Sequence, residues 1–181
     1  MPYLVTLVVL VGVLCLVNLV LIVGVIRRLR EHGEALADRS AQEQNRRAIL
    51  PEGEVAEPFE TVSTDGSVVS RDRLEQPTLV GFFSPGCTAC HEALPDFLAL
   101  AARFPGGPEQ VLAVILDENG ELGEQREALE PVARVVVEKL GGPVSSALHV
   151  RALPSFGLVG PGGRVMSSGL RLEQVLTTAP A

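Results

Sequence analysis

The spacing of apolar and polar positions changes along the chain, and the first stretch stands apart from the rest. From Leu4 to Ile26 there is no charged residue, and Leu and Val predominate. A helix of about 23 residues, rising roughly 1.5 Å at each, spans the hydrocarbon core of a bilayer. No basic segment precedes this run, which is also longer than the apolar part of a cleaved signal peptide. Residues 1–30 are therefore predicted to form an uncleaved transmembrane anchor.

Residues 31–50 have a different composition, rich in Glu, Gln, Arg and Ala with few apolar positions. We interpret them as a polar stalk, partly helical, that holds a following domain away from the membrane. Pro51 and Gly53 end this stretch, because both residues interrupt a helix. Residues 51–181 are then expected to form one globular domain.

Within residues 51–181, short apolar runs alternate with helical patterns. Asp65-Gly66 lies between the β-prone runs 59–62 and 68–70, which predicts a hairpin. Continuous apolar runs predict buried strands, and these cover residues 78–83, 111–116, 132–137 and 156–159. Helical patterns cover residues 88–104, 121–129, 144–148 and 170–176, with Pro95 expected to kink the first of them. The order predicts an α/β fold with a mixed sheet, closed by a hairpin and a helix.

Charge divides the chain in the same way. Residues 1–50 carry six Arg against four acids, a net of +2, whereas residues 51–181 carry nine Lys and Arg against eighteen acids, a net of −9; the sum is −7. An acidic domain argues against nucleic acid as a partner. The arginines follow the apolar span and none precedes it, so the positive-inside rule places the domain in the cytoplasm.

Cysteine usage points to chemistry rather than to a disulfide framework. Of three cysteines, Cys15 lies inside the predicted span, and the other two form Cys87-Thr88-Ala89-Cys90 at a predicted strand-to-helix junction. Orphan N–H groups and the positive end of the helix favour a thiolate at Cys87. Cys87 would attack a disulfide, and Cys90, one turn along, would resolve the mixed disulfide.

Other readings of the same motif are open. His91 completes C-x-x-C-H, the attachment signature of c-type haem, with His91 as axial ligand. A zinc site would need a second Cys/His pair at ligand spacing, which the chain does not offer. The strand–helix context favours dithiol chemistry, with no bound cofactor required.

From Pro51 onward the chain resembles the thioredoxin-fold domain of membrane-anchored TlpA-like thiol-disulfide oxidoreductases. The resemblance rests on Gly53 with Pro58-Phe59, the Asp65-Gly66 hairpin, the stretch Phe82 to Cys90, Pro95, and Leu153-Pro154. The form Phe-x-Ser-Pro-x-Cys is most similar to the accessory proteins of methylamine dehydrogenase maturation (MauD-like). The resemblance implies catalytic Cys87 and Cys90, and a cis bond at Pro154 that exposes the backbone of Leu153 to a substrate peptide.

The resemblance also implies client proteins with thiols or disulfides, a separate redox partner, and an extracytoplasmic domain, which conflicts with the positive-inside rule. The chain departs from the family in three respects: it has no Trp, no Pro between the cysteines, and Gly81 where thioredoxins carry a buried acid. A peroxiredoxin-like peroxidase is an alternative, because Ser84 precedes Cys87 at the spacing of that motif, although the motif's proline is replaced by Val80. A tethered, non-catalytic binding module is the other alternative.

Overall fold

The computed structural model describes residues 49–120 and 123–176, together with Tyr3, Gly12 and Leu14. It divides the chain into two units, residues 1–43 and 44–181. In the first unit the three described residues are helical. The predicted anchor and stalk otherwise lie outside the described residues. Among the residues that are described, no helix has the length and apolar character needed to cross a membrane.

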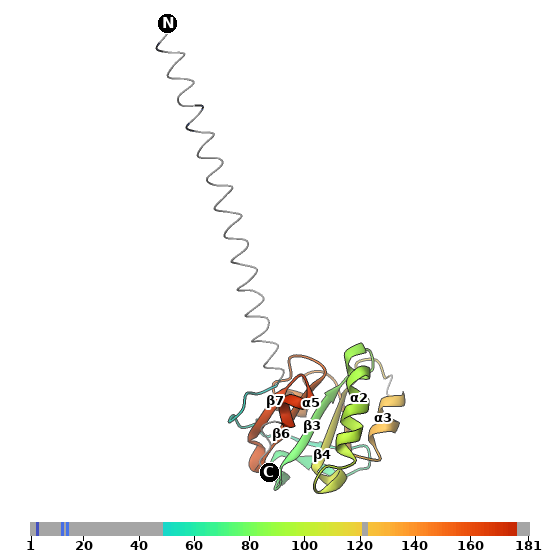
Figure 1. The fold of residues 1–181 in the computed structure, drawn as a ribbon. Helices are drawn as coiled ribbons and strands as arrows, with labels where there is room; N and C mark the ends of the chain where they lie inside the picture. Colours follow the sequence, from blue (N-terminus) through green and yellow to red (C-terminus); the bar gives the residue numbers. More distant parts are fainter. Residues whose placement is uncertain (1–2, 4–11, 13, 15–48, 121–122, 177–181) are drawn as a thin grey trace. The chain divides into compact units, whose positions relative to one another are not determined.

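A mixed sheet forms the centre of the second unit, with its five described strands in the order β5-β4-β3-β6-β7 (Figure 1). β3 runs parallel to β4, β4 runs parallel to β5, and β6 and β7 are antiparallel to their neighbours. The strands are β3 (Thr78–Phe83), β4 (Val111–Leu116), β5 (Arg134–Glu138), β6 (Ser155–Val159) and β7 (Val165–Gly169). The predicted α/β fold with a mixed sheet is confirmed.

The described helices follow the predicted order, with bounds that differ by a few residues. They are α2 (Thr88–Ala101), α3 (Gly123–Leu129), α4 (Pro143–Ala147) and α5 (Leu172–Leu176), with short 3-10 turns η1 (Arg71–Arg73), η2 (Gly107–Gln110) and η3 (Pro161–Gly163). α2 continues through Pro95 and ends three residues before the predicted Phe104. Phe104 precedes Pro105, and a residue before proline is pushed out of the helical region.

The start of β5 also differs from the prediction. The apolar pattern begins at Val132, but the N–H groups of Val132 and Ala133 both donate to the Leu129 carbonyl. These residues therefore complete the turn that ends α3, and the strand begins at Arg134. The spacing of apolar residues cannot distinguish a helix-ending turn from the start of a strand, because Val and Ala are buried equally well in both.

Two apolar layers cover the two faces of the sheet. Side chains alternate along β3, so that Leu79 and Phe83 face one cluster while Val80 and Phe82 face the other. The first cluster includes residues of α2, α3 and α5, and the second includes residues of α4 and of the segment before β3. Burial on both faces explains why β3 reads as a continuous apolar run.

The predicted hairpin is present as β1 (Glu60–Val62) and β2 (Val68–Ser70), which pair antiparallel. Gly66 has a φ of 87°, a conformation that favours glycine in a tight turn. The backbone N–H of Ser67 and the hydroxyl of Ser63 both donate to Asp65 Oδ1, at 2.8 and 2.7 Å. The side chain of Asp65 therefore stabilises the turn that contains it.

Residues assigned to the end of the predicted stalk are part of the folded domain. Ile49 and Leu50 are 2% and 6% exposed and belong to the second apolar cluster. The Leu50 N–H donates to the Leu148 carbonyl. A Cβ atom at Gly157 would lie 2.5 Å from Ile49 Cδ1, so the sheet leaves room for this side chain.

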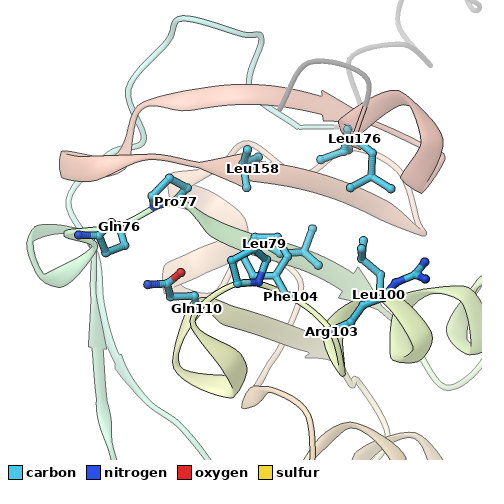
Figure 2. Close-up of a pocket in the computed structure, with 11 residues that line it drawn as sticks. Gln76, Pro77, Leu79, Leu100, Arg103, Phe104, Gln110, Leu158 and Leu176 are labelled. Carbon is cyan, nitrogen blue, oxygen red and sulfur yellow. The ribbon is translucent and has the colours of Figure 1, made fainter. Parts of the chain in front are cut away.

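A hollow of about 460 Å³ opens beside the first residues of β3 (Figure 2). Leu79 and Leu158 come from the sheet, Leu100 and Leu176 come from the ends of α2 and α5, and Phe104 comes from the segment after α2. Because Leu79 is the second residue of β3, this hollow lies at the end of the strand opposite to the cysteine motif. It takes no part in the candidate site described below.

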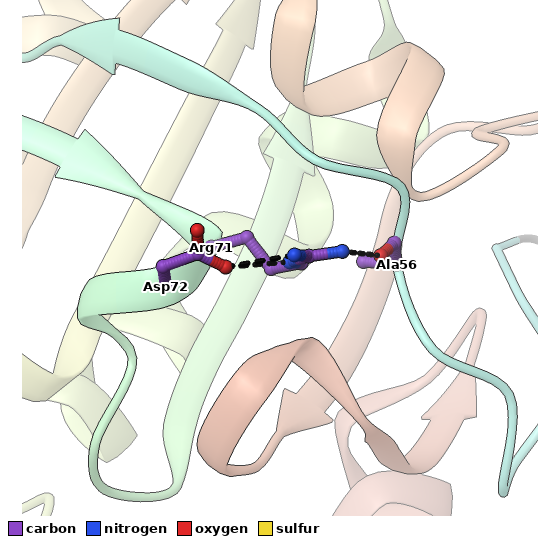
Figure 3. Close-up of polar contacts among 3 residues, drawn as sticks. All are labelled: Ala56, Arg71 and Asp72. Carbon is purple, nitrogen blue, oxygen red and sulfur yellow. Dashed lines mark hydrogen bonds and ion pairs between the residues drawn. The ribbon is translucent and has the colours of Figure 1, made fainter.

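Arg71 ties the segment before the hairpin to η1 (Figure 3). Its Nη1 donates to the Ala56 carbonyl at 3.3 Å, and its Nη2 lies 2.8 Å from Asp72 Oδ1. Ala56 itself is 1% exposed. The guanidinium thus satisfies a carbonyl at the edge of the second apolar cluster.

Candidate active site

The cysteine motif lies where the central strand passes into a helix. β3 ends at Phe83, and Cys87 is the residue that caps the N-terminus of α2. The Cys87 N–H donates to the Ser84 carbonyl at 3.2 Å, which closes the intervening turn. Cys87 Sγ accepts a hydrogen bond of 3.1 Å from the Cys90 N–H. A sulfur at a helix start that accepts from a backbone N–H is stabilised as a thiolate.

The two cysteines are joined by a disulfide and differ in exposure. Their Cα atoms are 5.2 Å apart. Cys90 is fully buried, whereas Cys87 is half-buried and packs at the edge of the first apolar cluster. After reduction, a protein substrate would therefore reach the sulfur of Cys87 before that of Cys90.

The second predicted element of the site is the loop before β6. The Leu153–Pro154 peptide bond is cis, as the family resemblance implied. Pro154 is buried, and Leu153 packs against both apolar clusters, including the one that holds Cys87 and Cys90. In the described part of the chain, no hydrogen bond uses the backbone N–H or carbonyl of Leu153. These groups are available to pair with an extended peptide.

Three phenylalanine rings fill the space that a buried acid would need. Phe97 lies 5.1 Å from Phe83 and 5.9 Å from Phe156 between ring centroids, and all three belong to the same cluster as Cys90. A Cβ atom at Gly81 would lie 2.6 Å from Phe97 Cε2 and 2.9 Å from Phe83 Cε2. The absence of an acid at position 81 is therefore built into the packing beneath the cysteines.

One buried polar residue beside the motif was not predicted from the sequence. Gln125, on α3, is 3% exposed, and its Nε2 donates to the Ser84 carbonyl at 3.3 Å. The sequence carried a partial signal, because Gln125 precedes the buried Leu129 by one helical turn and so shares its face. Its partner 41 residues away could not be inferred from spacing.

His91 lies at the exposed edge of the motif. Its Nε2 is 2.8 Å from the Pro85 carbonyl oxygen, and its backbone N–H donates to the Cys87 carbonyl at 3.2 Å. The ring therefore braces the turn that precedes Cys87. Within the described ranges, no carboxylate hydrogen-bonds to either cysteine sulfur, and the helix terminus provides favourable potential for a thiolate.

These features together define a thioredoxin-like domain: a mixed sheet, a C-x-x-C pair at the start of a helix, and a cis-proline loop in the same apolar cluster. Solved structures with this fold are similar to the chain. The thioredoxin domain of a thiol-disulfide oxidoreductase from Bacteroides vulgatus matches with a TM-score of 0.55 and 24% identity, over 71% of this chain and 95% of that one.

Two further structures agree. A thiol:disulfide interchange protein from a Bacteroides species gives a TM-score of 0.54 at 22% identity, over 71% of this chain and 88% of that one. A thio-disulfide isomerase from Thermus thermophilus gives 0.51 at 18% identity, over 71% and 93%. No family model and no curated protein matches the sequence. At these identities the likeness establishes the thioredoxin fold.

Proposed function

We propose that the chain is a thiol-disulfide oxidoreductase that exchanges disulfides in client proteins through Cys87 and Cys90. The observation that carries this proposal is the unequal exposure of a linked pair: Cys87 is half-buried at a helix start, and Cys90 is fully buried behind it. One accessible sulfur and one protected sulfur suit a nucleophile and a resolving thiol.

In the reducing direction, the Cys87 thiolate attacks one sulfur of a client disulfide. A Cys87–client disulfide forms, and the other client sulfur leaves as a thiolate. The Cys90 thiolate then attacks the Cys87 sulfur, forms the Cys87–Cys90 disulfide and releases the second client thiolate, so that two electrons pass to the client. The pair must then be reduced by a partner dithiol. The same steps in reverse oxidise a client.

Leu153 and Pro154 form the proposed client-binding ledge. The backbone groups of Leu153, which make no hydrogen bond among the described residues, lie in a loop that packs against the same cluster as Cys87. An extended client segment that hydrogen-bonds to them would add a short strand beside the nucleophile. Main-chain recognition of this kind accepts clients of many sequences.

We further propose that the protein is a single-pass membrane protein whose redox domain is extracytoplasmic, and that it resembles MauD-like maturation proteins. The apolar run from Leu4 to Ile26 supports the anchor, and the Phe-x-Ser-Pro-x-Cys form supports the subfamily. An oxidising compartment outside the cytoplasm would suit a C-x-x-C pair that acts on protein disulfides.

Disulfide reduction by single-cysteine variants tests the proposed chemistry. Cys87→Ser should abolish the reduction of insulin by the full chain, and Cys90→Ser should accumulate mixed disulfides with client proteins. Cys15→Ser is the matched control and should retain full activity. Full activity in Cys87→Ser would contradict the mechanism, and the absence of any trapped adduct in Cys90→Ser would favour a peroxidase or a binding role.

Topology is tested separately with a membrane-impermeant thiol reagent on intact cells, after mild reduction. Labelling of Cys87 in intact cells is expected for an extracytoplasmic domain. Labelling only after the cells are lysed would place the domain in the cytoplasm, as the arginines after the span suggest.

A further inference from the structure

Gln125 is a buried polar side chain whose hydrogen bonding is only half complete. It is 3% exposed, and its Nε2 donates to the Ser84 carbonyl at 3.3 Å. A carbonyl only accepts, so this contact fixes which end of the amide faces Ser84. The other end, Oε1, is buried and has no hydrogen-bond partner in the described structure. A buried acceptor without a donor destabilises the folded chain, because it loses its hydrogen bonds to water and gains none in return.

The contact with Ser84 connects Gln125 to the nucleophile. The Ser84 carbonyl also accepts the Cys87 N–H at 3.2 Å. One oxygen therefore receives both the backbone of the nucleophilic residue and the side chain of Gln125. This arrangement fixes the turn between β3 and α2 from the side of α3.

The orientation of α3 places Gln125 on the side of the cysteine pair. Gln125 and Leu129 are one turn apart on the buried face of this helix. Leu129 is fully buried in the cluster that contains Cys90 and Phe83. Gln125 therefore lies on the face of α3 that packs toward the end of β3 and the apolar cluster of the resolving cysteine.

Reduction of the Cys87–Cys90 disulfide creates a hydrogen-bond donor in the cysteine pair. In the disulfide neither sulfur carries a hydrogen, whereas in the reduced pair the buried Cys90 thiol carries an S–H group that donates weakly. Since the space beneath the pair is filled by Phe97 and Phe83 at Gly81, no carboxylate can occupy the position from which thioredoxins accept such a proton. The unpaired Oε1 of Gln125, on α3, is a neutral acceptor that could serve in place of such a carboxylate.

We propose that Gln125 is a positioning residue for the dithiol: its Nε2 holds the Ser84 turn in both redox states, and its Oε1 accepts a hydrogen bond from the reduced pair, directly or through one water molecule. This inference rests on the proposed dithiol function. It makes the amide a stabiliser of the reduced form, because the acceptor is unsatisfied in the disulfide and satisfied in the dithiol. The pair is thereby made more oxidising.

The test is the redox equilibrium of the full chain with glutathione. Gln125→Leu removes the buried acceptor, so the equilibrium should shift three- to tenfold toward the disulfide, which corresponds to a potential about 15–30 mV more negative. Gln125→Met, which keeps the unbranched shape, should shift it in the same direction. Glu127→Leu, at an exposed position of the same helix, is the control and should leave the equilibrium unchanged.

Stability measured in both redox states separates this role from simple packing. The lost contact with Ser84 should destabilise both forms equally, and the lost Oε1 contact should destabilise the reduced form further, by the same three- to tenfold factor in the unfolding equilibrium. Equal destabilisation of both forms with an unchanged glutathione equilibrium would overturn the proposal. If Gln125→Leu does not fold, Gln125→Met decides by the same criteria.

The failure of the role proposed for Gln125 and the failure of the proposed function give different results. Wild-type chain that equilibrates with glutathione but fails to reduce insulin would contradict disulfide exchange with clients while leaving the role of Gln125 measurable. Wild-type chain that reduces insulin, with variants whose equilibrium is unchanged, would contradict the role of Gln125 alone.

Discussion

Replacing Gly81 by alanine adds one methyl group at the centre of β3, where the sheet meets the phenylalanine cluster. The new Cβ would lie 2.6 Å from Phe97 Cε2 and 2.9 Å from Phe83 Cε2. Carbon atoms in contact prefer about 3.5–4.0 Å, so the Phe97 ring must move by about 1 Å. Phe97 is fully buried and packs against Phe83 and Phe156, so this movement is passed on to both rings.

Two opposing effects set the size of the change. Alanine reduces the entropy of the unfolded chain and suits a strand interior better than glycine, which stabilises by about 0.4–1 kcal/mol. Overpacking a rigid core destabilises by about 1–3 kcal/mol. We expect overpacking to dominate, with a net loss of about 1–2 kcal/mol in the free energy of unfolding, because the ring that must move has no open side.

Urea unfolding followed by circular dichroism measures this loss, since the chain has no Trp for fluorescence. Gly86→Ala is the matched control: no atom lies within 4 Å of its added Cβ, so it should be neutral or slightly stabilising. Phe97→Leu should relieve the clash, so the double variant should be about 1 kcal/mol more stable than the sum of the single effects. A neutral or stabilising Gly81→Ala, or strict additivity with Phe97→Leu, would refute the packing argument.

Three further predictions concern other parts of the domain. Glu138 accepts hydrogen bonds from two backbone N–H groups at the start of α4, one of them that of Ser145 at 2.7 Å. Glu138→Ala should therefore lower the free energy of unfolding by about 1–2 kcal/mol in thermal melts. An unchanged melting temperature would contradict a capping role. The Ser63 hydroxyl holds the pKa of Asp65 below its ordinary 3.8. The hydrogen bond to the Asp65 carboxylate should therefore stabilise the hairpin above pH 3.8, and this stabilisation should be lost as the pH falls through the folded pKa. NMR spectra should show this acid step in the wild-type chain but not in Asp65→Asn. Ile49→Ala should cost about 2–4 kcal/mol on urea unfolding, because the side chain is 2% exposed; a negligible loss would mean that this residue lies outside the cooperative domain.

The strands were the most predictable part of the fold. The bounds of β3 and β4 coincide with the apolar runs 78–83 and 111–116. Both strands are covered on both faces, so nearly every position is apolar and the run begins and ends with the strand. The Asp65-Gly66 turn was equally visible, because its geometry is fixed by the turn residues themselves.

Helix ends and the apolar segment before the hairpin were less predictable. Apolar positions continue past Ala101 to Phe104, but the proline that follows releases the chain from the helix. Ile49 and Leu50 are isolated apolar residues after a polar stretch, and periodicity gives no reason to bury them. They are buried because the face of the sheet opposite α2 offers them a place.

The sequence by itself determined the chemistry of this protein: a C-x-x-C pair, its position at a strand–helix junction, and the proline that ends the loop before β6. These are local features, set by residues within a few positions of one another. Only the tertiary structure decided what surrounds the pair, because the surroundings come from residues far apart in the chain. Phe97 fills the space above Gly81, Gln125 reaches Ser84 from another helix, and Leu153 joins the cluster of Cys87. Such contacts follow from packing across the sheet, which no spacing along the sequence encodes.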